Sequence, residues 1–300
     1  MSDEKIPDPK AIREAEAAGL VFSEDKKTLL KCKAIGKVII PDGVTKIGSR
    51  AFEGCSLTHV KIPDSVTVIG EQAFYCCSAL ADVKIPDGVT VIGRGAFSEC
   101  SALTDVKIPD SATKIEEGAF EYCECLTEVI IPGSVTEIGA RAFSCCRALT
   151  DVKMPDGVTE IGASAFAACS NLTGINIPRS VIKIGDSAFA GCSALTSINI
   201  PQSVTKIGAW AFWRCSALVD VNIPDSVTEI GWWAFEGCTS LTHVNIPDSV
   251  TEIGECAFSW CRALAGVKIP DSVTVIGKGA FAGAGCEEQV KRDYPRLFGK

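Results

Sequence analysis

Cysteine, histidine and tryptophan are the residue types in this chain whose number and spacing could carry chemistry. The 300-residue sequence holds 16 cysteines, 2 histidines and 5 tryptophans. A regular row of cysteines could form a metal or redox ladder, because thiolates bind soft metals and pair into disulfides. Eleven cysteines do recur every 22 or 23 residues, and we call them the cysteine column: Cys32, Cys55, Cys77, Cys100, Cys123, Cys146, Cys169, Cys192, Cys215, Cys238 and Cys261.

The spacing of the cysteine column favours a structural role. A metal site needs ligands that converge on one point, whereas residues one repeat apart form a line, and no C-x-x-C motif occurs. Free cysteine commonly serves as a small buried apolar side chain. His59 and His243 occupy the same repeat position eight repeats apart, too far to share one catalytic site. We therefore expect reduced buried thiols, no metal, no cofactor and no enzymatic activity.

The period itself predicts the fold. Ile-Pro and Ala-Phe dipeptides recur in step with the cysteines, and one unit reads LTDVKIPDSATKIEEGAFEYC from Leu103 to Cys123. We expect a first extended run, a turn with Pro109 at its first central position, a second extended run, and then a tight turn or single helical turn. The side chains expected to point inward are Leu103, Val106, Ile108, Ala112, Ile115, Phe120 and Cys123.

The consensus LTxVxIPxSVTxIGxxAFxxC resembles the BspA-like leucine-rich repeats, over residues 32–281. The resemblance implies a repeat solenoid: a right-handed leucine-rich-repeat superhelix, mainly β with short helical turns, and a parallel sheet on its concave face. For this chain it implies about 11 coils, capped at both ends. It further implies a non-enzymatic module, commonly displayed on a surface, that binds proteins or host components.

Three segments follow from where the period starts and stops. Residues 1–31 are expected to be an N-terminal cap with a helix over 11–18, and 32–281 the repeat array. Residues 282–300 are expected to be a C-terminal cap, with a helix over 287–293 and with Leu297 and Phe298 folding onto the last coil. The first repeat is irregular, and its Ile35 aligns with the inward Leu103 of the standard unit.

The outward residues of the first extended run divide the array into two zones. The first five strands carry acidic and basic residues such as Asp82 and Lys84, which we expect to neutralise one another across neighbouring coils. Later strands carry an asparagine ladder whose amides could bond from coil to coil, and which offers a less charged docking surface. Its members are Asn176, Asn199, Asn222 and Asn245.

All five tryptophans lie between positions 210 and 260. Trp210 and Trp233 fill the same slot in successive repeats, so their rings should stack about 5 Å apart. Trp213, Trp232 and Trp260 occupy adjacent slots, and Arg214 could stack on one of the rings. These slots elsewhere hold mostly small or charged residues, so we expect an aromatic patch on one rim, either at an interface or shielding its neighbours.

The sequence therefore predicts a non-enzymatic scaffold that binds a protein partner through these tryptophans, Arg214 and the asparagine ladder. A carbohydrate-binding or adhesion surface and a self-associating structural solenoid remain alternatives. The formal net charge of −8 argues against a nucleic-acid surface, and no apolar run is long enough to span a membrane. The polar start and the reduced thiols predict a cytoplasmic protein, with a secreted or cell-surface location as the alternative.

Overall fold

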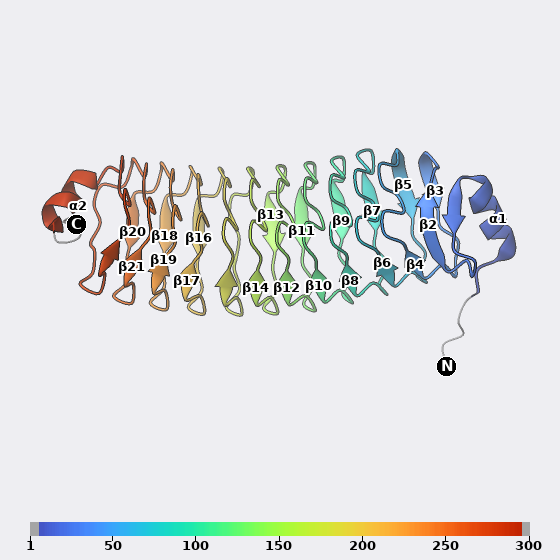
Figure 1. Ribbon diagram of the computed structural model, residues 1–300, viewed down its shortest axis with the longest axis horizontal. Helices are drawn as coiled ribbons and strands as arrows, with labels where there is room; N and C mark the ends of the chain where they lie inside the picture. The colour runs from blue at the N-terminus through green and yellow to red at the C-terminus, as the bar shows by residue number, and fades with distance from the viewer. Residues whose placement is uncertain (1–5, 296–300) are drawn as a thin grey trace. The chain divides into compact units, whose positions relative to one another are not determined.

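The computed structural model describes residues 6–295 and divides the chain into two compact units, residues 1–149 and 150–300. Each unit is a β-solenoid in which one 23-residue repeat forms one coil, and the strands of successive coils lie side by side (Figure 1). About ten turns are formed in all, in rough agreement with the eleven expected. Leu297 and Phe298, expected to cover the last coil, lie outside the described residues.

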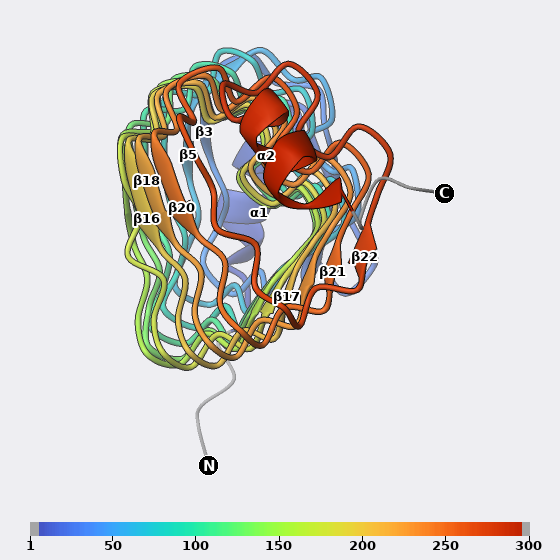
Figure 2. The same ribbon diagram turned by 90° about the vertical axis from the view of Figure 1, so that its left-hand side faces the viewer.

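Each regular coil contributes two short strands that belong to different sheets. We call the strands of the first extended run, which form more than one sheet, the front row, and those of the second run the back row. Figure 2 shows β16, β18 and β20 on one side of the coil and β17, β21 and β22 on the other. The segment that leads from the back row to the next front strand is called the turn edge. Both rows are parallel, because each strand meets the equivalent strand of the next coil.

Unit 1 begins with helix α1 (Pro9–Ala17), which Asp8 caps by accepting a hydrogen bond from the Lys10 amide at 3.0 Å. Ile12 and Ala15 are the buried residues of this helix and cover the interior of the first coil. The bounds of the helix are close to the expected 11–18. An antiparallel pair follows, formed by β1 (Leu20–Phe22) and β2 (Thr28–Cys32). The front row is β3 (Gly36–Ile39), β5 (Leu57–Lys61), β7 (Asp82–Lys84) and β9 (Asp105–Lys107), with β11 (Glu128–Ile130) in the last coil; the back row is β2, β4 (Lys46–Ile47), β6 (Val68–Ile69), β8 (Val91–Ile92), β10 (Lys114–Ile115) and β12 (Glu137–Ile138).

Unit 2 repeats this arrangement and ends in helix α2 (Glu287–Asp293), at the predicted position. The helix covers the last coil through hydrogen bonds: the Val267 amide donates to Gln289 and the Ile269 amide donates to the Tyr294 hydroxyl. The front strands are β13 (Asp151–Lys153), β16 (Ser197–Asn199), β18 (Asp220–Asn222) and β20 (His243–Asn245); the back strands are β14 (Glu160–Ile161), β15 (Lys183–Ile184), β17 (Lys206–Ile207), β19 (Glu229–Ile230), β21 (Glu252–Ile253) and β22 (Val275–Ile276).

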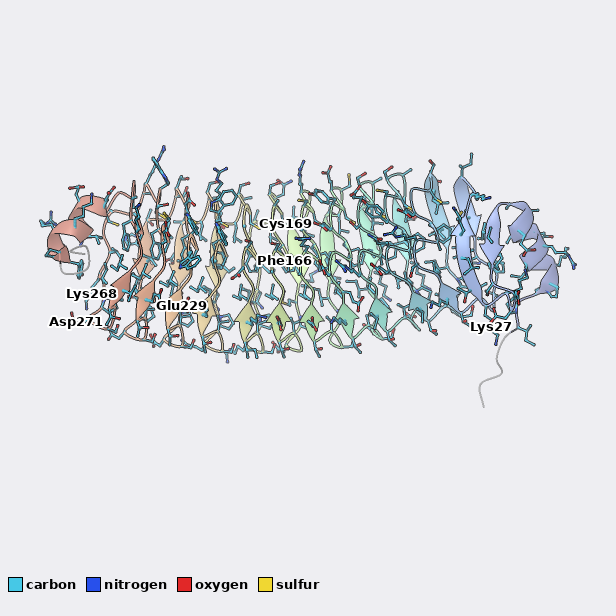
Figure 3. The ribbon with its side chains drawn as sticks, in the orientation of Figure 1. Lys27, Phe166, Cys169, Glu229, Lys268 and Asp271 are labelled. Carbon is cyan, nitrogen blue, oxygen red and sulfur yellow. The ribbon has the colours of Figure 1, made fainter. Side chains whose placement is uncertain are left out.

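The interior of each coil is filled by the residues that the period marks as inward. Leu103, Ile115, Phe120 and Cys123 have no exposed surface, and Val106 and Ile108 are nearly as buried. Figure 3 shows the equivalent Phe166 and Cys169 pointing into the coil. Phenylalanine rings of successive coils stack face to face, with centroids 4.7–5.7 Å apart. These stacks bury a continuous apolar row that no single coil could cover alone.

Two local expectations are wrong. The turn after the front strand is closed by the Ala112 amide donating to the Pro109 carbonyl at 2.9 Å, so proline is the first residue of the turn, not its first central residue. Proline there holds Ile108 in the extended conformation that the strand end requires. Ile35 is 78% exposed because a register shift at Gly36 pairs that glycine with Leu57, and the glycine takes the inward position.

The acidic and basic residues of the front row were expected to lie opposite one another in neighbouring coils, but the strand register places like charges opposite each other. Asp82 pairs with Asp105, and Lys84 with Lys107, so like charges are neighbours across these coils. In the front row, Asp82 also contacts His59 of the preceding coil at 3.2 Å. Lysine and glutamate side chains pair across coils in the back row. There Lys114 lies 3.2 Å from Glu137, and in unit 2 Lys206 lies 2.7 Å from Glu229.

Candidate functional site

The five tryptophans lie on the turn edge of unit 2. Trp210 and Trp233 stack with their ring centroids 5.1 Å apart and their planes 2° apart, which confirms the predicted stacking. Trp232 meets the ring of Trp233 edge-on at 6.3 Å. Both stacked residues have positive φ, +55° for Trp210 and +54° for Trp233, and this left-handed backbone is uncommon for side chains of their size.

Exposure of the indole rings differs within the set. Trp210, Trp232 and Trp260 are 39, 55 and 51% exposed, while Trp213 and Trp233 are half-buried. Ala211 and Phe212, which lie between Trp210 and Trp213 in the sequence, are fully buried. The tryptophans therefore stand outside the apolar interior, as expected from their slots.

Two of the tryptophans line a groove of about 760 Å³, which we call the basic aromatic groove. The Trp213 indole N–H donates to Glu236 Oε2 at 3.1 Å, which fixes the ring at one wall. Trp210, Trp232 and Trp233 do not line this groove. The aromatic rim predicted from the sequence is therefore divided into two groups: Trp213 and Trp260 in the groove, and the other three tryptophans outside it. The groove is lined by Gly191, Ser193, Trp213, Arg214, Ser216, Glu236, Gly237, Thr239, Trp260 and Arg262.

Each tryptophan of the groove carries an arginine on its ring. The Arg214 guanidinium carbon lies 4.4 Å from the Trp213 ring centroid, as the sequence suggested, and that of Arg262 lies 5.3 Å from the Trp260 ring. Cation–π contacts of this kind hold a guanidinium flat against the ring. Its N–H groups then point outward from the ring's edge and can bind an anionic group.

Two glycines make room for these side chains. A Cβ on Gly283 would lie 3.0 Å from the Trp260 ring, and a Cβ on Gly237 would lie 3.3 Å from Cγ of Arg214. Both glycines have positive φ, so the chain reaches these positions without strain. The aromatic and cationic side chains therefore rest directly on the backbone of the next coil.

The same edge of unit 1 carries a second groove, of about 480 Å³, with opposite charge. Its lining residues are Cys76, Ser78, Glu99, Ser101, Tyr122 and Glu124. Glu99 accepts hydrogen bonds from the Tyr75 hydroxyl and the Cys76 thiol, both at 2.9 Å, and this carboxylate raises the pKa of Tyr75. Sequence reasoning missed both grooves. Most residues that line the grooves directly precede or directly follow a cysteine of the column in the sequence. The residue types at these two repeat positions could have predicted the grooves.

The asparagine ladder lies on the front row of unit 2, in register. Asn199 pairs with Asn222, and Asn222 with Asn245, while an isolated bridge joins Asn176 to Asn199. All four side chains are exposed. In residues 6–295 no hydrogen bond links their amides from coil to coil, in contrast to the bonding expected from the sequence.

The cysteine column is buried except for Cys55, which is half-buried, and most of its thiols donate to a main-chain carbonyl. Cys192 Sγ lies 3.1 Å from the Phe166 carbonyl oxygen, and Cys123 Sγ lies 3.2 Å from that of Phe97. Burial raises the pKa of Cys192 to about 12. Within residues 6–295 no cluster of three His, Cys, Asp or Glu side chains could hold a metal ion. His59 contacts Asp82 at 3.2 Å, and His243 contacts the Thr242 hydroxyl at 3.0 Å.

Comparison with known proteins identifies the family. The model of the BspA-type leucine-rich-repeat region matches residues 25–150, 92–219 and 183–290, so the chain belongs to this family. Proteins of this family and fold are repeat scaffolds and are generally non-enzymatic. No curated protein shows a significant match to the chain. No helix in the described part of the chain is long and apolar enough to cross a membrane.

Solved bacterial structures are similar over most of the chain. A leucine-rich-repeat protein from Bacteroides ovatus is 29% identical, with 92% of this chain and 95% of that chain covered and a TM-score of 0.60. A leucine-rich cell surface protein from Faecalibacterium prausnitzii is 33% identical, with 89% and 90% covered and a TM-score of 0.54. A leucine-rich-repeat protein from Eubacterium ventriosum is 24% identical, with 83% and 76% covered and a TM-score of 0.58, and shows the fold alone.

Proposed function

We propose that this chain is a non-enzymatic scaffold that binds a protein partner through the basic aromatic groove of unit 2. The observation that carries the proposal is the pair of arginine-capped tryptophans, Trp213 with Arg214 and Trp260 with Arg262. Tryptophan and arginine are the residues most enriched at the energetic centres of protein interfaces. The Trp213 indole is half-buried and fixed by its hydrogen bond to Glu236, which gives a partner a wall that is already ordered.

Trp210, Trp232, Trp233 and the asparagine ladder are proposed as secondary contacts. The stacked pair offers ring edges and one outer face to a partner. Stacking covers the inner faces of both rings, and this lowers the support for a sugar-binding platform, which needs open ring faces. Self-association through the same rings remains an alternative, and sedimentation velocity of the Trp210→Ala/Trp233→Ala variant tests it.

The compartment is part of the proposal. The absence of a disulfide among the sixteen cysteines supports a reducing environment such as the cytoplasm. The similar protein of F. prausnitzii is a cell surface protein and supports surface display as the alternative. Immunodetection in fractionated cells of the source organism distinguishes the two.

Affinity capture with matched variants tests the binding proposal. Wild-type chain, Trp213→Ser/Trp260→Ser and the unit 1 control Tyr122→Ser are immobilised and exposed to the same protein mixture. The proposal expects at least one protein that the wild type and the control retain and the groove variant loses. An identical set of retained proteins on all three would contradict it, provided that circular dichroism shows all three folded.

A further inference from the structure

The basic aromatic groove has a charge and a spacing that define what would fit it. We propose that it binds an extended acidic segment of the partner protein, with two carboxylates three residues apart. This inference rests on the proposed function and deepens it by naming the chemistry of the partner. Arg214 and Arg262 would each bind one carboxylate, and the indoles of Trp213 and Trp260 would pack against the residues between them.

The charge of the groove is unusual for this chain. The formal net charge is −8, yet the two charged side chains that face outward along the groove are arginines. Neither Arg214 nor Arg262 forms an ion pair in the described structure, since their recorded side-chain contacts are with the indole rings. Glu236 is the one acidic lining residue, and one of its oxygens accepts the Trp213 indole N–H.

The planar guanidinium groups of Arg214 and Arg262 are suited to binding carboxylates. A guanidinium held flat on an indole loses little further freedom on binding, and its N–H edge matches the two oxygens of a carboxylate. The aliphatic part of Arg214 is also confined, because Gly237 brings the backbone of the next coil against it. The site is therefore preorganised for two separate anionic groups.

The distance between the two arginines sets the spacing of the ligand. Arg214 and Arg262 come from coils two steps apart, and a step between paired strands is about 4.8 Å, so their backbone positions are about 10 Å apart along the stack. Arg214 precedes a column cysteine and Arg262 follows one, so the two positions are also offset sideways across the turn edge. A polyproline II segment has three residues per turn and rises about 3.1 Å per residue. Residues i and i+3 of such a segment face the same way, about 9.3 Å apart, which matches the component of the arginine spacing along the stack, and the long arginine side chains span the sideways offset.

The indoles of Trp213 and Trp260 also favour a bound segment in the polyproline II conformation. Grooves lined by aromatic rings bind polyproline II segments, because the extended helix is already ordered and its proline rings pack on the indoles. A segment of the form acid-Pro-Pro-acid satisfies the charge, the spacing and the aromatic surface together. The groove of unit 1 offers the opposite environment, since Glu99 and Glu124 line it. An acidic segment should therefore avoid that groove.

Calorimetric titration with synthetic peptides tests the inference. The probe is an end-blocked peptide containing Glu-Pro-Pro-Glu, and the matched peptides contain Gln-Pro-Pro-Gln or Glu-Pro-Pro-Pro-Glu. Wild-type chain should bind the first peptide, and each matched peptide should bind about tenfold more weakly. Arg214→Gln/Arg262→Gln should abolish the preference for carboxylates. Arg147→Gln, at a surface arginine of unit 1 that pairs with Glu124, is the control and should bind like the wild type.

Three outcomes would overturn the inference. The glutamate and glutamine peptides could bind equally, no peptide could bind, or the double arginine variant could bind like the wild type. A further arm uses polygalacturonate: binding that is tighter than to the peptide and lost in the double variant would make the ligand an acidic glycan, and the peptide assignment wrong. If affinity capture shows a partner lost in Trp213→Ser/Trp260→Ser while no acidic peptide binds, the proposed function stands and this inference fails.

Discussion

Replacing a thiol of the cysteine column by a methyl group should have an effect on stability that depends on pH. Cys192 has no exposed surface, and its Sγ lies 3.1 Å from the Phe166 carbonyl. That carbonyl also accepts the Cys169 amide at 3.3 Å, so Cys192→Ala leaves it hydrogen-bonded. The variant loses one buried heavy atom, and we expect its free energy of unfolding near neutral pH to be lower by about 1 kcal/mol.

Burial raises the pKa of the Cys192 thiol to about 12, from its ordinary value of 9.0. Between pH 9 and pH 12 this thiol stays protonated in the folded chain but loses its proton in the unfolded chain. The free energy of unfolding therefore falls as the pH rises above about 9. At pH 10 the difference amounts to about 1.4 kcal/mol, which is RT times the natural logarithm of about 11. The contribution of the thiol is thus full below pH 9 and is lost toward pH 12.

The destabilisation by Cys192→Ala should therefore vanish, or change sign slightly, between pH 7.5 and pH 10. Urea unfolding followed by circular dichroism measures it, and comparing the two chains at each pH removes the shared titration of lysines. Cys125→Ala is the control, because that thiol is exposed in the folded chain, and its effect on the free energy of unfolding should be small. An effect of Cys192→Ala that is equal at both pH values would refute the reasoning that burial holds this thiol neutral.

Three further predictions concern the fold. Gly139→Ala should lower the free energy of unfolding by about 1–3 kcal/mol, since the new Cβ would lie 2.7 Å from backbone atoms of the preceding coil, whereas Gly133→Ala, which meets nothing within 4 Å, should change it by less than about 0.5 kcal/mol. Phe120→Ala should cost about 3–5 kcal/mol in urea unfolding, because it opens a gap in a ring stack with 5.4 Å spacing on both sides. Lys206→Ala should cost less than about 1 kcal/mol, since its ion pair with Glu229 is exposed, and the cost should disappear in 1 M salt.

The outcomes that would contradict these predictions are specific. Equal melting temperatures for Gly139→Ala and Gly133→Ala would show that the coils can separate to admit a methyl group. A cost below about 1 kcal/mol for Phe120→Ala would mean that the stack collapses around the gap. A cost for Lys206→Ala that persists in 1 M salt would assign the lysine a role other than its ion pair.

The repeat architecture was predictable because a strict period leaves few solutions. Residues that recur every 23 positions meet their equivalents in the next coil, so Phe120 had to stack on Phe97 once the coils formed. Local exceptions were not predictable from the period. The outward Ile35 depends on the register shift at Gly36, and the place of Pro109 in its turn depends on which carbonyl the Ala112 amide reaches.

The candidate site was only partly predictable for a related reason. Trp210 and Trp233 share a slot, and a shared slot suffices to predict a stack. The separation of Trp213 and Trp260 from that stack depends on how the turn edge directs each side chain, and on Gly283 leaving room for the Trp260 ring. Each coil has two residues with positive φ in this segment, such as Trp210 and Arg214, and they set the directions of the neighbouring side chains. These directions do not follow from which residues are adjacent in the sequence.

The most direct test of the central claim, that the basic aromatic groove of unit 2 binds a protein, is site-specific photocrosslinking. A photoreactive residue is placed at Ser216, inside the groove, and separately at Ser101, the equivalent position of unit 1. The account predicts that one protein, identified by mass spectrometry, is crosslinked from position 216 and not from 101, and that Trp213→Ser/Trp260→Ser abolishes the adduct. The same adducts from both positions, or an adduct at 216 that survives the double substitution, would contradict it.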